Sequence, residues 1–139
     1  MNYLKKTKIL MGTVALLFLG FTLLSTTDIF QEPWTVPAKY KSMKNTQKDK
    51  ADGDNIGKTL YGTHCKSCHG TKGLGDGKKS TELESVMRSF ASADVQKQTD
   101  GEIYYKSFIG RNEMPNYEKK IKSETDRWFI VNYIRTMKK

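Results

Sequence analysis

One pentapeptide, Cys65-Lys66-Ser67-Cys68-His69, constrains this chain of 139 residues more than any other feature. Two cysteines at this spacing lie on one helical turn, so each thiol can add to a vinyl group of the same porphyrin. The imidazole of the next residue can then reach the iron. The motif therefore predicts one covalently bound haem c, attached through Cys65 and Cys68, with His69 as a ligand of the iron.

Two other uses of paired cysteines fit the chain poorly. A structural zinc site needs about four Cys or His ligands, and the chain has two cysteines and two histidines, all between His64 and His69. A redox dithiol is expected beside a βαβ pattern rich in β-branched residues. The residues around the motif lack that pattern, which favours haem attachment.

The first 27 residues have the pattern of an export signal. Lys5, Lys6 and Lys8 precede residues 9–27, which carry no charge and would span about 28 Å as a helix. Because that length approaches the hydrocarbon thickness of a membrane and no Ala-x-Ala site follows, we expect residues 1–27 to remain as a membrane anchor. Cleavage would instead release a soluble periplasmic protein. In both cases the basic flank predicts that the rest of the chain lies on the periplasmic side of the inner membrane.

The exported part of the chain is basic. Without the three lysines of the signal, it keeps +6 of the overall charge of +9. Such a charge can steer docking onto acidic partner surfaces, or it can be a solvated face without a specific partner. Nucleic acid is not an expected partner, because the lysines are spread along an exported chain.

Residues 28–53 have the composition of a linker. Pro33 and Pro37 restrict the backbone, and a polar run follows at residues 44–54. As a random coil, this tether would have a mean end-to-end distance of about 30 Å. Its apolar residues are expected to pack on the chain's own surface rather than on a partner; they are Trp34, Val36, Tyr40 and Met43.

Residues 54–139 are expected to form one domain of helices and loops. The first helix is predicted at residues 54–66, with Asp54 as N-cap and with Gly57 allowing another helix to approach closely. Four glycines make residues 70–77 a loop, and a short helix is expected at residues 82–88.

Two N-terminal capping patterns predict the remaining helices. Thr99 and Glu102 have capping-box spacing, and their helix should end at Gly110. Ser123 begins a weaker box that opens the last helix. Apolar residues recur there with a helical period, at Ile130, Tyr133, Ile134 and Met137, with Trp128, Phe129 and Val131 widening the face.

Met114 is the best candidate for the second axial ligand of the iron. It lies between two predicted helices and precedes Pro115, which can hold the sulfur in place. Met87 is a weaker candidate, and the absence of any methionine ligand stays open. Met43 belongs to the linker and Met137 to the core face of the last helix, while His64 adjoins Cys65 and starts on the wrong side of the porphyrin.

These features together resemble the class I c-type cytochromes, the family that includes mitochondrial cytochrome c and many bacterial monohaem carriers. The resemblance covers residues 54–139. Members have a glycine and an aromatic residue before C-x-x-C-H, then a glycine-rich loop, a Met-Pro loop, and a last helix whose aromatic residue crosses the first helix. The matching residues are Gly57, Tyr61, Cys65 to His69, Gly70, Gly73, Gly75, Asp76, Gly77, Met114, Pro115, Tyr117 and Tyr133.

The resemblance implies a small all-α domain around one haem c and its iron, and a function in reversible one-electron transfer rather than in enzymatic catalysis. No small-molecule substrate is expected. Membrane redox complexes or periplasmic oxidoreductases, respiratory or denitrifying, are the partners that it implies. Many members have a proline after the glycine-rich loop, whose carbonyl accepts the Nδ1 proton of the axial histidine. Here that position reads Gly77-Lys78-Lys79, which leaves the accepting carbonyl open.

Two other functions remain open from the sequence. A haem-c gas sensor or small peroxidase would need a sixth ligand that leaves easily. A haem-bearing subunit of a larger respiratory complex would place residues 34–43 against a neighbour, which is compatible with electron transfer.

Overall fold

The computed structural model describes residues 32–138, and these residues form helices and loops without a named strand. The only ladder pairing in this range is an isolated bridge between Arg111 and Met114. The expected all-helical domain is therefore confirmed. The predicted anchor at residues 1–27 lies outside the described residues. No helix between residues 32 and 138 is long and apolar enough to cross a membrane.

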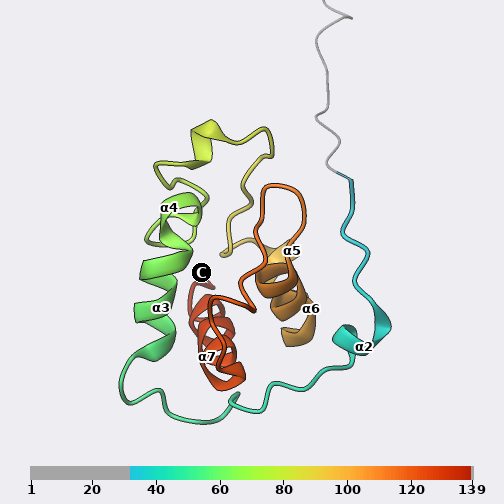
Figure 1. Ribbon diagram of the computed structural model, residues 1–139, viewed down its shortest axis with the longest axis vertical. Helices are drawn as coiled ribbons and strands as arrows, with labels where there is room; N and C mark the ends of the chain where they lie inside the picture. The colour runs from blue at the N-terminus through green and yellow to red at the C-terminus, as the bar shows by residue number, and fades with distance from the viewer. Residues whose placement is uncertain (1–31, 139) are drawn as a thin grey trace, which may run out of the picture. The chain divides into compact units, whose positions relative to one another are not determined.

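Two helices, α3 (Ile56–His64) and α7 (Glu124–Arg135), pack directly against each other (Figure 1). A Cβ atom on Gly57 would lie 2.2 Å from the carbonyl oxygen of Phe129, so only glycine permits this approach. One turn later the rings of Tyr61 and Tyr133 meet edge to face, with centroids 5.2 Å apart. The predicted close approach at Gly57 and the predicted crossing at Tyr133 are both confirmed.

The core is built mainly on the apolar face of α7. The indole of Trp128 is fully buried and lies 4.5 Å from the ring of Tyr104, which in turn meets Phe108 at 4.9 Å. Burying these large rings is the main favourable contribution to folding. The buried members of the cluster are Tyr61, Ile103, Tyr104, Phe108, Ile121, Trp128, Ile130, Val131 and Ile134.

The start of α3 differs from the prediction. Asp52, not Asp54, caps the helix, because its two carboxylate oxygens accept hydrogen bonds from the backbone N–H groups of Ile56 (2.7 Å) and Gly57 (2.8 Å). Asn55 has a left-handed backbone with φ of 53°, and this turn carries the chain from Asp52 into the helix. The predicted cap at Asp54 is wrong because the capping side chain precedes the turn instead of adjoining the helix.

The predicted helix at residues 82–88 is also wrong. The structure has a short 3₁₀ turn, η1 (Ser80–Glu82), then irregular chain, and then a single helical turn, α5 (Ala93–Gln96). The backbone N–H groups of residues 84 and 85 donate to the distant carboxylate of Glu113 at 2.9 and 2.8 Å. These bonds give the backbone partners outside any local helix.

The capping predictions for the last two long segments hold. Thr99 and Glu102 form a complete reciprocal box at the start of α6 (Asp100–Tyr104), which continues as a wider π-helical turn, η2 (Tyr105–Ile109). Gly110 ends it with φ of 72°. At α7, the Ser123 hydroxyl accepts a hydrogen bond from the Asp126 N–H at 3.2 Å.

Residues 32–47, here called the N-terminal strap, pack on the domain and include the one-turn helix α2 (Ala38–Lys41). The strap runs past α6 and α7 before α3 begins (Figure 1). Val36 is buried, and Tyr40 and Met43 pack against the core. The expectation that these apolar residues cover the chain's own surface is confirmed. The random-coil description is wrong for this part, because its side chains have fixed partners.

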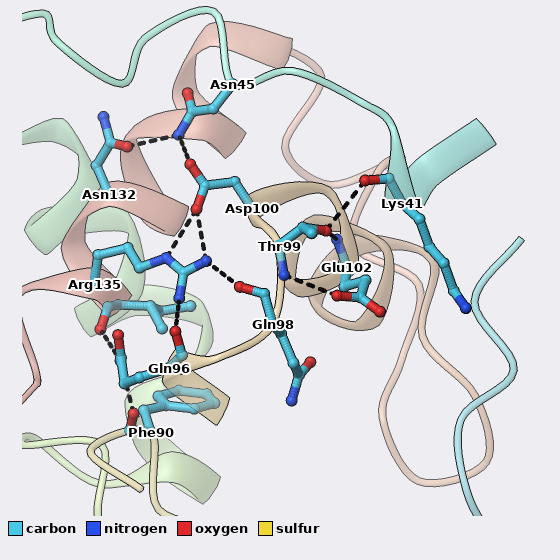
Figure 2. Close-up of polar contacts among 11 residues, drawn as sticks. Lys41, Asn45, Phe90, Gln96, Gln98, Thr99, Asp100, Glu102, Asn132 and Arg135 are labelled. Atoms are coloured by element: carbon cyan, nitrogen blue, oxygen red, sulfur yellow. Dashed lines mark hydrogen bonds and ion pairs between the residues drawn. The ribbon is translucent and has the colours of Figure 1, made fainter. Parts of the chain in front are cut away.

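Polar contacts fix the end of the strap to α6 and α7 (Figure 2). The Asn45 amide donates to Asp100 at 3.0 Å and to Asn132 at 2.8 Å. Asn132 donates to the carbonyl of Gln47 at 2.7 Å. Asp100 also pairs with Arg135 at 2.7 Å. These half-buried hydrogen bonds join three segments that are distant in sequence.

Candidate haem-binding site

The three residues of the attachment motif lie on one short helical turn. Cys65 follows the end of α3 and begins α4 (Lys66–His69). Its carbonyl accepts hydrogen bonds from the N–H groups of Cys68 (3.3 Å) and His69 (2.9 Å). All three side chains are half-buried. The fold therefore brings the two thiols and the imidazole together as the predicted attachment chemistry requires.

The imidazole of His69 is the clearest sign of a missing ligand interaction within the described part of the chain. Both ring nitrogens are buried, and neither has a hydrogen-bond partner. The ring stacks on Phe90 with centroids 4.4 Å apart. Burial lowers the pKa of His69 to about 4, so the ring is neutral at pH 7. A neutral imidazole with an unpaired nitrogen is the form that coordinates iron, and leaving it unpaired costs free energy.

The thiol of Cys65 is unlike a redox thiol. Burial and the neighbouring Cys68 raise the pKa of Cys65 to about 12. Reactive cysteines in dithiol oxidoreductases have lowered pKa values, because the thiolate is the nucleophile. The structure thus adds an electrostatic argument against the dithiol interpretation and fits cysteines whose sulfurs become thioethers.

The glycine-rich loop folds back onto the attachment turn. The N–H groups of Gly75 and Gly77 donate to the carbonyls of His69 (3.0 Å) and Cys68 (3.2 Å). A Cβ atom on Gly77 would lie 2.4 Å from the carbonyl oxygen of Ser67, so the close approach requires glycine. These bonds hold the backbone around His69 without using its side chain.

Tyr61 connects α3 to the same loop. Its buried hydroxyl donates to the carbonyl of Gly70 at 2.7 Å. Burial, with Cys65 nearby, raises the pKa of Tyr61, so the hydroxyl stays protonated and remains a donor. The loop is therefore fixed to the α3–α7 pair at its first residue.

The residues after the glycine-rich loop do not supply the expected acceptor for His69 Nδ1. The carbonyl of Gly77 accepts from both the N–H and the hydroxyl of Ser80, at 2.9 and 2.6 Å. The carbonyl of Lys79 accepts from Glu82 at 3.2 Å. The 3₁₀ turn thus uses the carbonyls that follow the loop, which is where this chain departs from the proline-containing pattern.

Met114 lies in a tight turn, and Tyr117, three residues later, contacts His64 next to the attachment motif. The Met114 N–H donates to the carbonyl of Arg111 at 2.9 Å, and the Met114 side chain is half-buried. The Tyr117 hydroxyl donates to the carbonyl of His64 at 3.0 Å, and the two rings meet edge to face at 5.9 Å. Met114 itself makes no hydrogen bond to the motif within the described residues, so the structure connects the two through Tyr117.

The other candidate ligands have different surroundings. Met43 and Met137 pack against the core, as expected for Met137. Met87 lies against Gly75, where a Cβ atom would meet the Met87 carbonyl oxygen at 2.7 Å. His64 is half-buried beside Tyr117. The role of His64 as a surface or haem-edge histidine stays a prediction.

Two charged side chains with structural contacts were not predicted from the sequence. Glu113 joins the Met114 turn to residues 84 and 85. Arg127 is buried on α7, where it donates to the Tyr104 hydroxyl and to the Ile121 carbonyl, both at 2.6 Å. Neither side chain has a local signal, because each partner is distant in sequence or is a backbone atom.

Comparison with known proteins identifies the domain. The family model of cytochrome c matches residues 55–138, which include the attachment turn, the glycine-rich loop, the Met114 turn and both packed helices. No curated protein matches the chain. Cys65, Cys68 and the unpaired imidazole of His69 fit the covalently bound haem c of that family. With its matching domain and its haem-attachment residues, this chain belongs to the cytochrome c family.

Proposed function

We propose that this protein is a single-electron carrier in a respiratory or related chain, with His69 and Met114 as the two axial ligands of its haem c. The bound haem iron supplies a reversible one-electron couple, as is general in this family. The observation that carries the proposal is the buried imidazole of His69, whose nitrogens have no partner in the described chain.

The residues around His69 favour electron transfer over substrate chemistry. Phe90 covers one face of the imidazole, and the glycine-rich loop covers the backbone of the attachment turn. Cys65 and Cys68 keep the cofactor in place through both oxidation states, because they bind it covalently. Surroundings that move little when charge changes favour fast electron exchange, and the chain needs no catalytic acid or base for this function.

Met114 is proposed as the second axial ligand because of its position in a restrained turn. Gly110 and Asn112 both have positive φ, 72° and 50°, and Pro115 follows directly. A methionine ligand leaves no open coordination site and raises the reduction potential. The proposed role therefore excludes oxygen chemistry and favours the reduced state.

The proposal also places the domain on the periplasmic side of the inner membrane, with residues 1–27 as anchor or as cleaved signal. Membrane redox complexes or periplasmic oxidoreductases are the proposed partners, and the basic charge of the exported part supports docking on acidic surfaces. Residues 34–43 are not proposed as a subunit interface, because Val36, Tyr40 and Met43 are covered by the chain's own domain.

Replacement of Met114 by alanine tests the ligand assignment. Ferric haem with a methionine ligand has a weak red charge-transfer band from the sulfur to the iron. We expect Met114→Ala to abolish this band and to lower the reduction potential, while the matched control Met87→Ala keeps both. Persistence of the band in Met114→Ala would show that another methionine is the ligand.

Carbon monoxide separates electron transfer from gas sensing or peroxidase chemistry. A closed iron with two protein ligands should react with carbon monoxide slowly and incompletely at neutral pH. Rapid and complete conversion of the reduced protein would instead favour a labile sixth ligand and contradict the proposed carrier function.

A further inference from the structure

Arg111, three residues before Met114, has its side chain on the N-terminal strap. Its guanidinium carbon lies 4.4 Å from the centroid of the Trp34 ring. One terminal nitrogen donates to the Pro33 carbonyl at 3.1 Å and the other donates to the Glu32 carbonyl. A planar guanidinium can stack on an aromatic ring and donate in a fork at the same time, which a lysine cannot do.

The strap that receives Arg111 is itself held on the domain. The Trp34 ring meets Tyr105 edge to face at 6.3 Å, and the Tyr40 ring lies 4.7 Å from the same Tyr105. Further along, the Asn45 amide bonds to α6 and α7 (Figure 2). Arg111 therefore contacts a segment that other side chains already hold against the domain.

The backbone of Arg111 is part of the Met114 turn. Its carbonyl accepts the Met114 N–H at 2.9 Å, and the two residues form the isolated bridge. On Gly110, a Cβ atom would lie 2.2 Å from the Met114 carbonyl oxygen, so the turn is closely packed on itself. A turn this tight transmits a displacement of the Arg111 backbone to Met114.

We propose that Arg111 is a positioning residue for Met114, and that the N-terminal strap, through Trp34 and the carbonyls of Glu32 and Pro33, holds the Met114 turn in the conformation in which its sulfur would bind the haem iron. This inference rests on the proposed ligand role of Met114. It assigns the strap a function in setting the sixth ligand, in addition to connecting the exported domain to residues 1–31.

Imidazole binding to the ferric full-length protein measures how readily the methionine turn opens, because imidazole must displace the sulfur. We expect Trp34→Ala to raise the apparent affinity for imidazole about 2- to 30-fold, the range that corresponds to loss of a cation–π contact. Trp34→Phe, which keeps an aromatic face, should restore most of the wild-type affinity. Arg111→Lys should act in the same direction as Trp34→Ala, because it loses the fork of hydrogen bonds.

Asn45→Ala is the matched control, since it removes strap contacts that lie away from Arg111. We expect it to lower the stability to denaturant while leaving the imidazole affinity within about twofold of wild type. Equal affinities in wild type and Trp34→Ala would overturn the proposal. A rise in Asn45→Ala as large as that in Trp34→Ala would also overturn it, because general loosening would then explain both.

The same titration distinguishes this inference from the ligand assignment on which it rests. Imidazole should abolish the red charge-transfer band of the wild-type ferric protein, and Met114→Ala should lack that band before imidazole is added. A wild-type protein without the band would refute the Met114 assignment itself. A band that is present and equally resistant to imidazole in all strap variants would refute only the role of the strap.

Discussion

The α3–α7 pair and the loops that face the attachment turn are stabilised in different ways. The pair is held by close packing of its own atoms, with Gly57 against the backbone of Phe129 and Tyr61 against Tyr133. The loops at residues 70–90 and 110–122 are held by backbone hydrogen bonds and by the polar side chains of Tyr61, Glu113 and Tyr117. His69, beside them, keeps two unpaired ring nitrogens. The packed pair thus forms a scaffold, whereas the loops need the covalently bound haem to complete their core.

The largest effect is expected from a substitution that disrupts the packing of α3 on α7. Gly57→Ala places a Cβ atom where the Phe129 carbonyl oxygen lies, and we expect it to lower the free energy of unfolding by about 2 kcal/mol. The matched control is Gly62→Ala on the same helix, where a Cβ atom has nothing within 4 Å. That control should raise stability by about 0.5–1 kcal/mol through helix propensity. Denaturant titration of both variants measures the contrast, and equal effects would contradict the close approach.

A smaller effect is expected where the scaffold meets the loops. Tyr61→Phe removes the buried hydroxyl that donates to the Gly70 carbonyl but keeps the ring that packs on α7. Leaving that carbonyl without a donor should cost about 1.5 kcal/mol of unfolding free energy. Hydrogen exchange should show the loss of protection mainly in residues 70–77. Uniform loss across α3 and α7 would mean that the hydroxyl supports the scaffold instead of the loop.

An intermediate case is the start of α6, which lies outside both regions. Thr99→Ala removes the hydroxyl that accepts the Glu102 N–H at 3.1 Å and so breaks the capping box. We expect a loss of about 1 kcal/mol in unfolding free energy, measured by denaturant titration. The red charge-transfer band should be unchanged, because the box lies at the opposite end of the helical segment from Gly110. A lost band would show that the cap reaches the methionine turn.

The smallest expected effect concerns the hydrogen bonds that join two loops, from the backbone of residues 84 and 85 to the Glu113 carboxylate. Hydrogen bonds from Ser85 and from the Glu84 backbone lower the pKa of the Glu113 carboxyl. Glu113→Gln keeps the size of the side chain but gives up one of its two acceptor oxygens. We expect about a two- to threefold rise in imidazole affinity and no measurable change in overall stability, because the side chain is exposed. A marked loss of stability would place Glu113 in the scaffold.

The division between scaffold and loops also explains what the sequence could predict. The helical period at Ile130 and Ile134, the glycine at position 57 and the capping box at Thr99 are local patterns with local physical causes, and the structure has each of them. The attachment turn is likewise determined by five consecutive residues. These features could be predicted because each signal and its effect lie within a few residues of each other.

Most of the features that were missed depend on partners far along the chain. Glu113 accepts hydrogen bonds from residues almost thirty positions earlier, where a local helix had been predicted. Arg111 bonds to strap residues that lie more than seventy positions earlier in the sequence. Such pairings depend on the folded arrangement of several elements, and no spacing in the sequence indicates them. Asp52 is a local case: it caps α3 from four residues before Ile56, across the left-handed turn at Asn55.

The most direct test of the central claim is an optical redox titration of the full-length protein, made with its haem attached. We predict a single reversible one-electron transition, with the red charge-transfer band of methionine ligation present in the oxidised form and absent in the reduced form. A protein that shows no reversible transition, or whose oxidised form lacks that band, would contradict an electron carrier with His69 and Met114 as ligands.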